Sequence, residues 1–211
     1  MSVRVKICGV TSVADALHAV ECGADMIGLN FYPPSPRFLT LSAAHAIRAA
    51  LPPHIQCVGV FVNAAREEIA ALVARVPLDI IQFHGDETAT ELRGWPCPTI
   101  KVTRIPAVWV PADGVIPPLE AASSTYLLLD TYNPGRYGGT GEMFAWDAAA
   151  ALPQAVRQRL LLAGGLTPDN VAAAVRTVRP WAVDVASGVE STPGQKKSRK
   201  STSVYHQCQD S

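Results

Sequence analysis

The sequence has 211 residues, of which 48% are hydrophobic and 17% are charged. This length suits one domain, and the composition is typical of a globular protein and excludes an intrinsically disordered chain. Lysine plus arginine and aspartate plus glutamate each number 18, so the formal net charge at pH 7 is zero. A neutral chain has no field that gathers nucleic acid, and no basic stripe with interleaved aromatic residues precedes residue 196, so we expect no nucleic-acid partner.

The start of the chain predicts a protein without an export signal or a membrane anchor. Met1 leads directly into the charge-alternating strand pattern of Val3–Ile7, and no stretch approaches the roughly eighteen apolar residues of a membrane span. The cysteines are scattered and show neither C-x-x-C spacing nor metal-ligand spacing with histidine. They are Cys8, Cys22, Cys57, Cys97 and Cys208. We therefore expect a soluble cytoplasmic protein with reduced thiols, no metal site and no membrane partner.

Apolar runs with the composition of β-strands recur along the chain. In chain order they are Val3–Cys8, Met26–Asn30, Cys57–Val62, Asp79–Gln82, Thr99–Val102, Tyr126–Asp130, Leu160–Ala163 and Ala182–Val185. Between them lie segments with helical periodicity or helix-start signals. These are Val13–Glu21, Ser42–Ala50, Arg66–Arg75, Glu87–Arg93 and Pro168–Val178. The segments after the fifth and sixth runs are short or rich in proline, so we expect weak or irregular helices there.

Strands that alternate with helices indicate right-handed crossovers and a parallel sheet. Eight such units in this length predict a closed (β/α)8 barrel, the TIM-barrel fold, as a single domain of residues 1–211. A doubly wound open sheet is the alternative. Short connections after most strands favour the barrel, because a barrel needs every strand to end on the same face.

The last part of the chain, residues 196–211, fits the barrel pattern least well. A surface helix needs about three or four apolar residues in two turns on one face, but only Val204, Tyr205 and Cys208 are apolar here. The run Lys196–Ser203 starts with charges and continues with residues of poor helix propensity. We therefore expect a frayed or only partly helical eighth helix, and a barrel that tolerates the loss of most of this tail.

Polar residues at the carboxyl ends of the strands are the first functional candidates, because active sites of such barrels lie on that face. They are Cys8, Asn30, Asn63, Gln82 with His84, Lys101, Asp130, and Asp184 with Ser187.

Cys8 and Asp130 have the clearest positions among these candidates. Strand alternation in Val3–Cys8 turns Lys6 and Cys8 toward the barrel axis. Asp130 ends a fully apolar strand, where an unpaired carboxylate is costly. Free cysteine usually packs as a small hydrophobe, and an acid at a strand end often caps a turn. Taken singly, both residues are therefore open to a structural interpretation.

Glycines follow the seventh and eighth strands. Gly164 and Gly165 come after the seventh, and Ser187 with Gly188 comes after the eighth. Barrel enzymes commonly bind phosphate in these two loops through backbone N–H groups. Mere turns are the alternative, but two neighbouring glycine-bearing loops favour a phosphate site.

Between residues 3 and 197, a series of motifs in order resembles the phosphoribosylanthranilate isomerase family. The motifs are Val5–Thr11, Gly23–Gly28, Phe31–Pro33 with Ser35–Arg37, Val58–Asn63, Gln82–Glu87, Leu128–Asp130, Gly138–Gly141, Ala163–Leu166 and Val183–Glu190. The opening Lys-Ile-Cys-Gly and the closing Asp-Val-x-Ser-Gly-Val-Glu are highly specific in combination.

The resemblance implies an isomerase of tryptophan biosynthesis that carries out an Amadori rearrangement. Its substrate would be N-(5-phosphoribosyl)anthranilate and its product 1-(2-carboxyphenylamino)-1-deoxyribulose 5-phosphate. In the family, the residues that match Cys8 and Asp130 are the general base and the general acid, and the one that matches Arg37 contacts the anthranilate carboxylate. The thiolate form of Cys8 requires a lowered pKa, which Lys6 or a positive helix end could provide.

The remaining implied roles concern binding. Asp184 could hydrogen-bond the amine nitrogen of the substrate, and the phosphate would lie on Gly164, Gly165, Ser187 and Gly188. The reaction needs one acid and one base, so we expect no metal ion and no organic cofactor. The partner is a small phosphorylated aminosugar, and the protein is a monomer or a homodimer.

Two other functions share part of this pattern. The histidine-pathway aminoaldose isomerase performs the same rearrangement with two carboxylates on a larger substrate, but Cys8 stands where that design has an acid. A non-catalytic barrel that binds a phosphate ligand would lack the acid or the base, and both are present.

Overall fold

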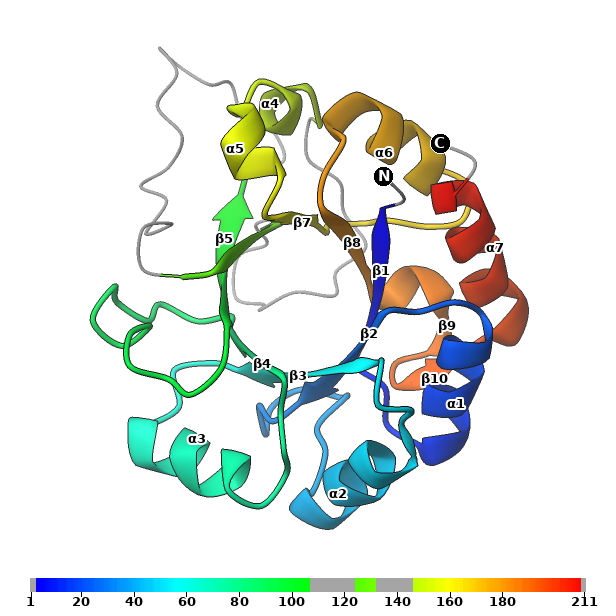
Figure 1. Cartoon of the computed structure of the whole chain (residues 1–211). Coiled ribbons are helices and arrows are strands. Elements are labelled where there is room, and N and C mark those ends of the chain that lie inside the picture. The colour runs from blue at the N-terminus through cyan, green and yellow to red at the C-terminus, as the bar shows by residue number, and fades with distance from the viewer. Residues whose placement is uncertain (1–2, 107–123, 132–145, 210–211) are drawn as a thin grey trace.

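The computed structural model describes residues 3–106, 124–131 and 146–209. Its strands form one closed barrel in which each strand pairs in parallel with the next and β8 pairs with β1 (Figure 1). The strands are β1 Arg4–Cys8, β2 Met26–Asn30, β3 Gln56–Phe61, β4 Ile80–Phe83, β5 Thr99–Ile105, β6 Tyr126–Thr131, β7 Leu160–Leu162 and β8 Ala182–Val185. The predicted (β/α)8 barrel is confirmed.

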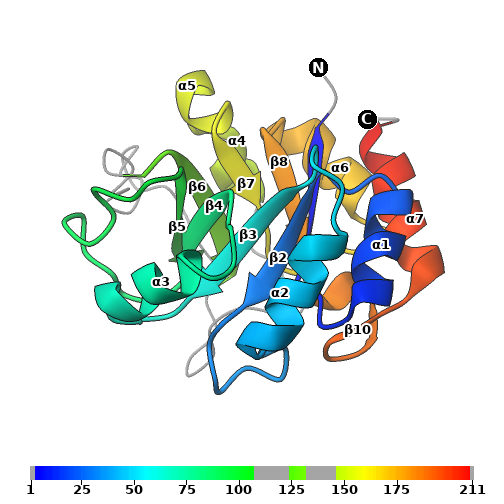
Figure 2. The same ribbon diagram turned by 60° about the horizontal axis from the view of Figure 1, so that its bottom comes forward.

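Helices surround the strands on the outside (Figures 1 and 2). They are α1 Val13–Glu21, α2 Leu41–Ala50, α3 Arg66–Val73, α4 Trp146–Ala150, α5 Gln154–Arg157, α6 Val171–Val178 and α7 Ser198–Gln209. The connection after β6 contains the two short helices α4 and α5, which agrees with the expected irregularity. The weak helix expected between the fifth and sixth strands falls largely on residues 107–123, which lie outside the described residues.

Strand alternation divides the buried side chains into two cores. Val5 and Ile7 of β1 belong to the larger core between the strands and the helices. A second core fills the barrel interior with apolar side chains from β2 to β8, among them Met26, Val58 and Leu128. The even-numbered positions of β1 therefore face inward, and the predicted inward orientation of Lys6 and Cys8 is confirmed.

The predicted helix Glu87–Arg93 is wrong, because this connection consists of turns. The Glu87 carboxylate accepts hydrogen bonds from the backbone N–H groups of Asn63 and Gly85 and from Lys101 Nζ at 2.8–3.1 Å. Glu91 folds back on the N–H and hydroxyl of Thr88, both at 2.7 Å. These side-chain bonds offer the backbone an alternative to the helical ladder, so helical periodicity alone misled the prediction.

The expected frayed tail is also wrong for residues 198–209, which form α7 and pack against α1, α6 and β1. Val204 is fully buried and Ser201 and Cys208 nearly so, while the Tyr205 ring lies against Gly23. These four positions have the i, i+3, i+4, i+7 spacing of a buried helix face. The face was missed because Ser201 counts as polar, although its small side chain fits a close contact.

Two features near the end of the chain were not predicted. A 3₁₀ turn, η3 Ser187–Val189, follows β8, and the antiparallel hairpin of β9 Glu190–Thr192 and β10 Gln195–Lys196 follows the turn. Figure 2 places β10 at the end of the barrel opposite the N-terminus. The hairpin therefore lies on the carboxyl face of the strands.

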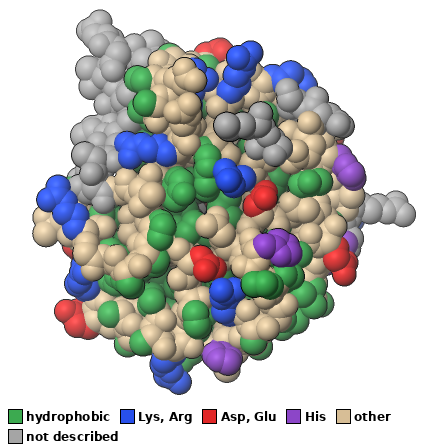
Figure 3. Space-filling view, in the orientation of Figure 1, with side chains coloured by type: hydrophobic (Ala, Val, Ile, Leu, Met, Phe, Trp, Pro, Cys, Tyr) green, Lys and Arg blue, Asp and Glu red, His purple; other side chains and the backbone are tan. Residues whose placement is uncertain are grey.

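One face of the molecule carries mixed charge (Figure 3). On the face shown in Figure 3, lysine and arginine side chains are interspersed with aspartate and glutamate side chains. Among the described residues, no helix is long and apolar enough to cross a membrane.

We predict that Val204→Ala lowers the free energy of unfolding by about 1.5–3 kcal/mol, because two buried methyl groups are lost and a cavity remains. Chemical denaturation of the two proteins measures this difference. Thr177→Ala, which shortens an exposed β-branched residue on the neighbouring α6, is the matched control and should change stability by less than about 0.5 kcal/mol. Equal stability of wild type and Val204→Ala would show that α7 does not pack on the barrel.

Candidate active site

The closing seam of the barrel carries a buried ion pair. Lys6 on β1 and Asp184 on β8 are partners in the strand register, and Lys6 Nζ donates to Asp184 Oδ1 at 2.8 Å. The Lys6 side chain is 0% exposed and that of Asp184 is 8% exposed. Burial lowers the pKa of Lys6, but Asp184 and Cys8 outweigh it, so the net pKa is raised. Lys6 is therefore a protonated ammonium inside the barrel.

Cys8 lies one layer above this pair at the end of β1. A β-carbon added to Gly28 on β2 would come within 2.9 Å of Cys8 Sγ and 3.1 Å of Lys6 Nζ. Because Gly28 has no side chain, the Cys8 thiol and the Lys6 ammonium can both lie against its backbone. The structure brings together Cys8 and Asp184, two of the residues that the sequence identified.

The pKa of the Cys8 thiol is raised above its ordinary value of 9.0. Burial is the largest cause, Lys6 and Lys196 act in the opposite direction, and Asp184 raises the pKa further. The expectation that Lys6 would bring the pKa down is therefore right about the direction of the Lys6 effect and wrong about the net result. In the free protein at neutral pH, the thiol form predominates.

Asp130 occupies the inward position at the end of β6, with 7% of its surface exposed. Its Oδ1 accepts a hydrogen bond from the Thr131 N–H at 2.8 Å, and its Oδ2 lies 3.4 Å from His84 Nε2. Gln82 Nε2 in turn lies 3.3 Å from His84 Nδ1. Asp130 therefore belongs to a polar group on β4 and β6, whereas Cys8 belongs to the group on β1 and β8. The Asp130 carboxyl group and the Cys8 thiol point into the same barrel from separate strands.

The loops after β7 and β8 meet as predicted. Gly164 and Gly165 both have positive φ angles, 82° and 64°, a conformation that favours glycine. A β-carbon on Gly188 would collide with the Leu166 carbonyl, so the Ser187–Gly188 turn packs on the backbone of the preceding loop. A β-carbon on Gly164 would collide with Thr131, the residue after Asp130. Gly164, Gly165, Ser187 and Gly188 thus form one glycine-rich region. Gly164 joins this region to the Asp130 side of the barrel mouth.

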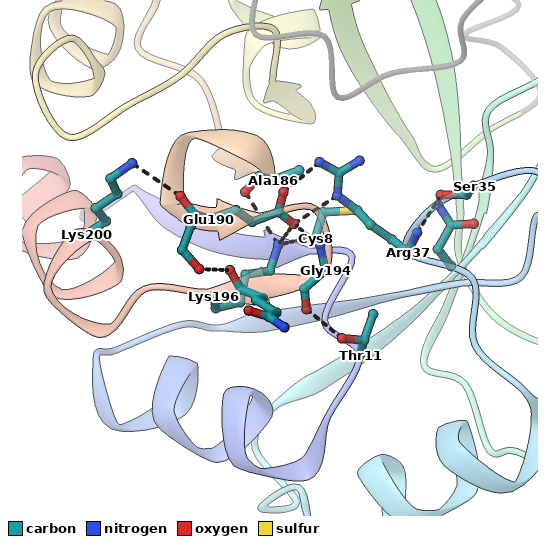
Figure 4. Close-up of polar contacts among 12 residues, drawn as sticks. Cys8, Thr11, Ser35, Arg37, Ala186, Glu190, Gly194, Lys196 and Lys200 are labelled. Carbon is teal, nitrogen blue, oxygen red and sulfur yellow. Dashed lines mark hydrogen bonds and ion pairs between the residues drawn. The ribbon is translucent and has the colours of Figure 1, made fainter.

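Arg37 lies in the loop after β2, and its contacts were not predicted. Its Nε and Nη2 donate to the two carboxylate oxygens of Glu190 at 2.8 and 2.6 Å (Figure 4). Lys196 Nζ donates to Glu190 Oε1 at 2.7 Å and to the Cys8 carbonyl at 2.5 Å. We call Arg37, Glu190 and Lys196 the mouth cluster. It joins Arg37 to the Cys8 side of the barrel.

Other polar residues at strand ends shape loops. Asn30 bonds Ser35 Oγ and the Tyr32 N–H, and Asn63 accepts from the Asp86 N–H. Lys101 pairs with Glu87 at 2.8 Å on the helix side of β5. Within the described part of the chain, no group of three or more His, Cys, Asp or Glu residues could hold a metal ion.

Comparison with known proteins identifies related chains. The sequence model of the family described as N-(5'-phosphoribosyl)anthranilate (PRA) isomerase matches residues 5–207. A Pseudomonas fluorescens (strain Pf0-1) protein named N-(5'-phosphoribosyl)anthranilate isomerase is 51% identical over 200 residues, which cover 94% of this chain and 95% of that one.

Solved structures agree with the sequence comparison. The crystal structure of phosphoribosyl anthranilate isomerase from Thermotoga maritima has a TM-score of 0.82 and 36% identity, and the match covers 99% of this chain and 100% of that one. A phosphoribosyl anthranilate isomerase in complex with reduced 1-(o-carboxyphenylamino)-1-deoxyribulose 5-phosphate has a TM-score of 0.78 and 34% identity, with the same coverage.

We predict that alkylation of Cys8 in the free protein keeps accelerating as the pH rises through 9.0, because burial raises the pKa of this thiol above that value and only the thiolate reacts. Iodoacetamide labelling, read by mass spectrometry of the peptide that contains Cys8, measures the rate, and Cys8→Ser gives the background. A labelling rate that levels off at a pH below 9.0 would contradict this charge balance.

Proposed function

The chain belongs to the N-(5'-phosphoribosyl)anthranilate isomerase family, and from this premise we propose which of its residues perform the reaction. The protein is an isomerase of tryptophan biosynthesis, and its substrate is a small phosphorylated aminosugar. The reaction converts N-(5'-phosphoribosyl)anthranilate into 1-(2-carboxyphenylamino)-1-deoxyribulose 5-phosphate. One observation carries the assignment of residues: an inward thiol beside a buried ammonium on β1, and an inward carboxyl group on β6, at the same end of one barrel.

Ring opening is the first step of the proposed mechanism. Asp130 in its protonated form donates its proton to the furanose ring oxygen, and the bond between this oxygen and C1′ breaks. The nitrogen lone pair forms a C1′=N bond at the same time, which gives a protonated Schiff base. The nearly buried position of Asp130, next to His84 and the Thr131 N–H, supports this role because it holds the carboxyl group in one orientation.

Proton abstraction is the second step. The Cys8 thiolate, which forms when the thiol loses its proton to solvent, takes the proton from C2′, the C1′=C2′ bond forms, and the electrons of the C1′=N bond return to nitrogen. The resulting enolamine then tautomerises to the ketone. Lys6 and Lys196 support this role because both favour the thiolate, and because a thiolate of high pKa is a strong base once formed.

Binding roles follow from the remaining contacts. We assign Arg37 to the anthranilate carboxylate, since a guanidinium fork matches a planar carboxylate. We assign Asp184 to the amine nitrogen, because it lies beside Cys8 and Lys6. Gly164, Gly165, Ser187 and Gly188 would bind the phosphate through backbone N–H groups. The mechanism uses no metal ion and no organic cofactor.

We further propose that the enzyme works in the cytoplasm, which its five free cysteines support. Either a monomer or a homodimer is compatible with this function, because every residue assigned to the site comes from one chain.

We predict that Cys8→Ser and Asp130→Asn each reduce kcat by about 10²–10⁴-fold, with little change in substrate binding, because each removes one proton-transfer group. The decrease of anthranilate-adduct fluorescence measures turnover. Circular dichroism of each variant shows whether it is folded. A folded variant with a kcat close to that of wild type would remove its residue from the mechanism.

We predict that Arg37→Lys weakens the binding of reduced 1-(o-carboxyphenylamino)-1-deoxyribulose 5-phosphate by about 1.5–3 kcal/mol, because lysine cannot offer two parallel N–H groups to a carboxylate. Isothermal calorimetry gives the dissociation constant. Lys197→Arg, at an exposed position after the hairpin, is the control and should bind as wild type does. An unchanged affinity of Arg37→Lys would exclude Arg37 from carboxylate recognition.

A further inference from the structure

The mouth cluster has a central carboxylate that serves several donors at once. Glu190 accepts two hydrogen bonds from Arg37, one from Lys196 and one from the Gly194 N–H, the last at 3.2 Å. The side chains of Glu190 and Lys196 are 4% and 1% exposed. Because the Glu190 carboxylate accepts hydrogen bonds from both Arg37 and Lys196, it fixes the positions of these two side chains.

The Arg37 stem is confined from a second direction. Gly9 follows Cys8 directly and has a φ of 69°, and a β-carbon there would collide with Arg37 Cδ. The guanidinium group therefore extends across bare backbone beside Cys8, with Glu190 on its Nε edge (Figure 4). Lys196 continues the chain of contacts, because it bonds both Glu190 and the Cys8 carbonyl.

The charge of the cluster suits an anionic ligand. Burial lowers the pKa of Lys196, whereas Glu190 and Cys8 favour its charged form. The pKa of Arg37 is raised by its bonds to Glu190. With both side chains protonated, one carboxylate balances only one of the two charges, and burial of the remaining positive charge is unfavourable without a further anion. Burial raises the pKa of Glu190, but Arg37 and Lys196 outweigh it, so the pKa is lowered and the carboxylate is ionised. The bonds to Glu190 use two of the five guanidinium N–H groups. Among the described residues, the Nη1 edge of Arg37 is left for a ligand.

We propose that Glu190 is a positioning residue that aims the outer edge of Arg37 at an aryl carboxylate and, through Lys196, keeps this edge in register with Cys8. The carboxylate class follows from the fork geometry, since Nη1 and the second N–H of Nη2 can bind two coplanar oxygens. Glu190 does not touch the substrate itself. This inference rests on the proposed function, and in particular on the assignment of Arg37 to the anthranilate carboxylate.

Two ligands and three variants test the proposal. The ligands are reduced 1-(o-carboxyphenylamino)-1-deoxyribulose 5-phosphate and the same compound with a phenylamino group that lacks the carboxylate. The variants are Glu190→Gln, which keeps the shape and removes the charge, Arg37→Ala, and the double variant. Dissociation constants come from calorimetry, KM and kcat from the fluorescence assay. Glu68→Gln, at an exposed position on α3, is the matched control.

We expect Glu190→Gln to weaken the carboxylate ligand about 10-fold to 100-fold, the value of a charge-assisted hydrogen bond, and to leave the other ligand unchanged. KM should rise while kcat changes little. In the Arg37→Ala background, Glu190→Gln should have no further effect on affinity, because Glu190 acts through Arg37. Glu68→Gln should match wild type in both assays.

Other outcomes overturn the proposal in distinguishable ways. An equal loss for both ligands, or an additive loss in the double variant, would mean that Glu190 acts independently of Arg37. If Glu190→Gln does not fold, Glu190→Asp replaces it: it keeps the charge, retracts the carboxylate by one methylene and should show the same ligand selectivity. Failure of wild type to bind either ligand would instead refute the proposed function, and the inference with it.

Discussion

The buried pair of Lys6 and Asp184 is the interaction on which the rest of the site depends. An ammonium with no exposed surface is tolerated only beside a counter-charge, since the uncompensated charge would cost several kcal/mol. Apolar side chains from β2 to β8 fill much of the barrel interior around the pair. Because Lys6 and Asp184 are register partners on β1 and β8, their pairing favours the register that closes the barrel, and it places Cys8 two residues farther along β1. Closure of the fold and placement of the thiol thus have one cause.

Charge is arranged in two layers above the apolar core. The lower layer is the neutral pair of Lys6 and Asp184, and the upper layer is the mouth cluster, where two cations share the Glu190 carboxylate. Asp130 lies on β6, and in the barrel order the glycine-rich loops after β7 and β8 lie between Asp130 and Cys8 on β1. A ligand with an aryl carboxylate at one end and a phosphate at the other matches this division, with its reacting carbons between Cys8 and Asp130.

Much of the fold followed from the sequence because strand alternation is enforced by a closed barrel. The inward positions of Lys6 and Cys8 could be assigned from Val5 and Ile7 alone. Periodicity failed at Glu87–Arg93, where Glu87 bonds to Lys101 on β5 instead of a helical neighbour, a tertiary contact that local pattern does not contain. It failed in α7 for a different reason, since the buried Ser201 does not register as apolar.

The binding side of the site was only partly predictable. Glycines after β7 and β8 indicated that the two loops would meet, because their bare backbones can pack closely. The roles of Glu190 and Lys196 were missed, although a signal existed: Pro193–Gly194 between two short polar segments is typical of a hairpin turn. A hairpin there pairs Glu190 with Lys196. The net pKa of Cys8 could not be predicted, because it depends on how burial and three neighbouring charges balance.

The most direct test of the account is a crystal structure of this chain with reduced 1-(o-carboxyphenylamino)-1-deoxyribulose 5-phosphate. We expect the carboxylate on the Nη1 edge of Arg37 and the phosphate oxygens about 2.7–3.2 Å from backbone N–H groups of the loops after β7 and β8. Cys8 Sγ should lie within about 3.5 Å of C2′, with Asp130 on the side of the 4′-hydroxyl, the oxygen that closes the ring in the substrate. A ligand bound in the reverse direction, with its phosphate on Arg37, would contradict the division of the barrel mouth on which these assignments rest.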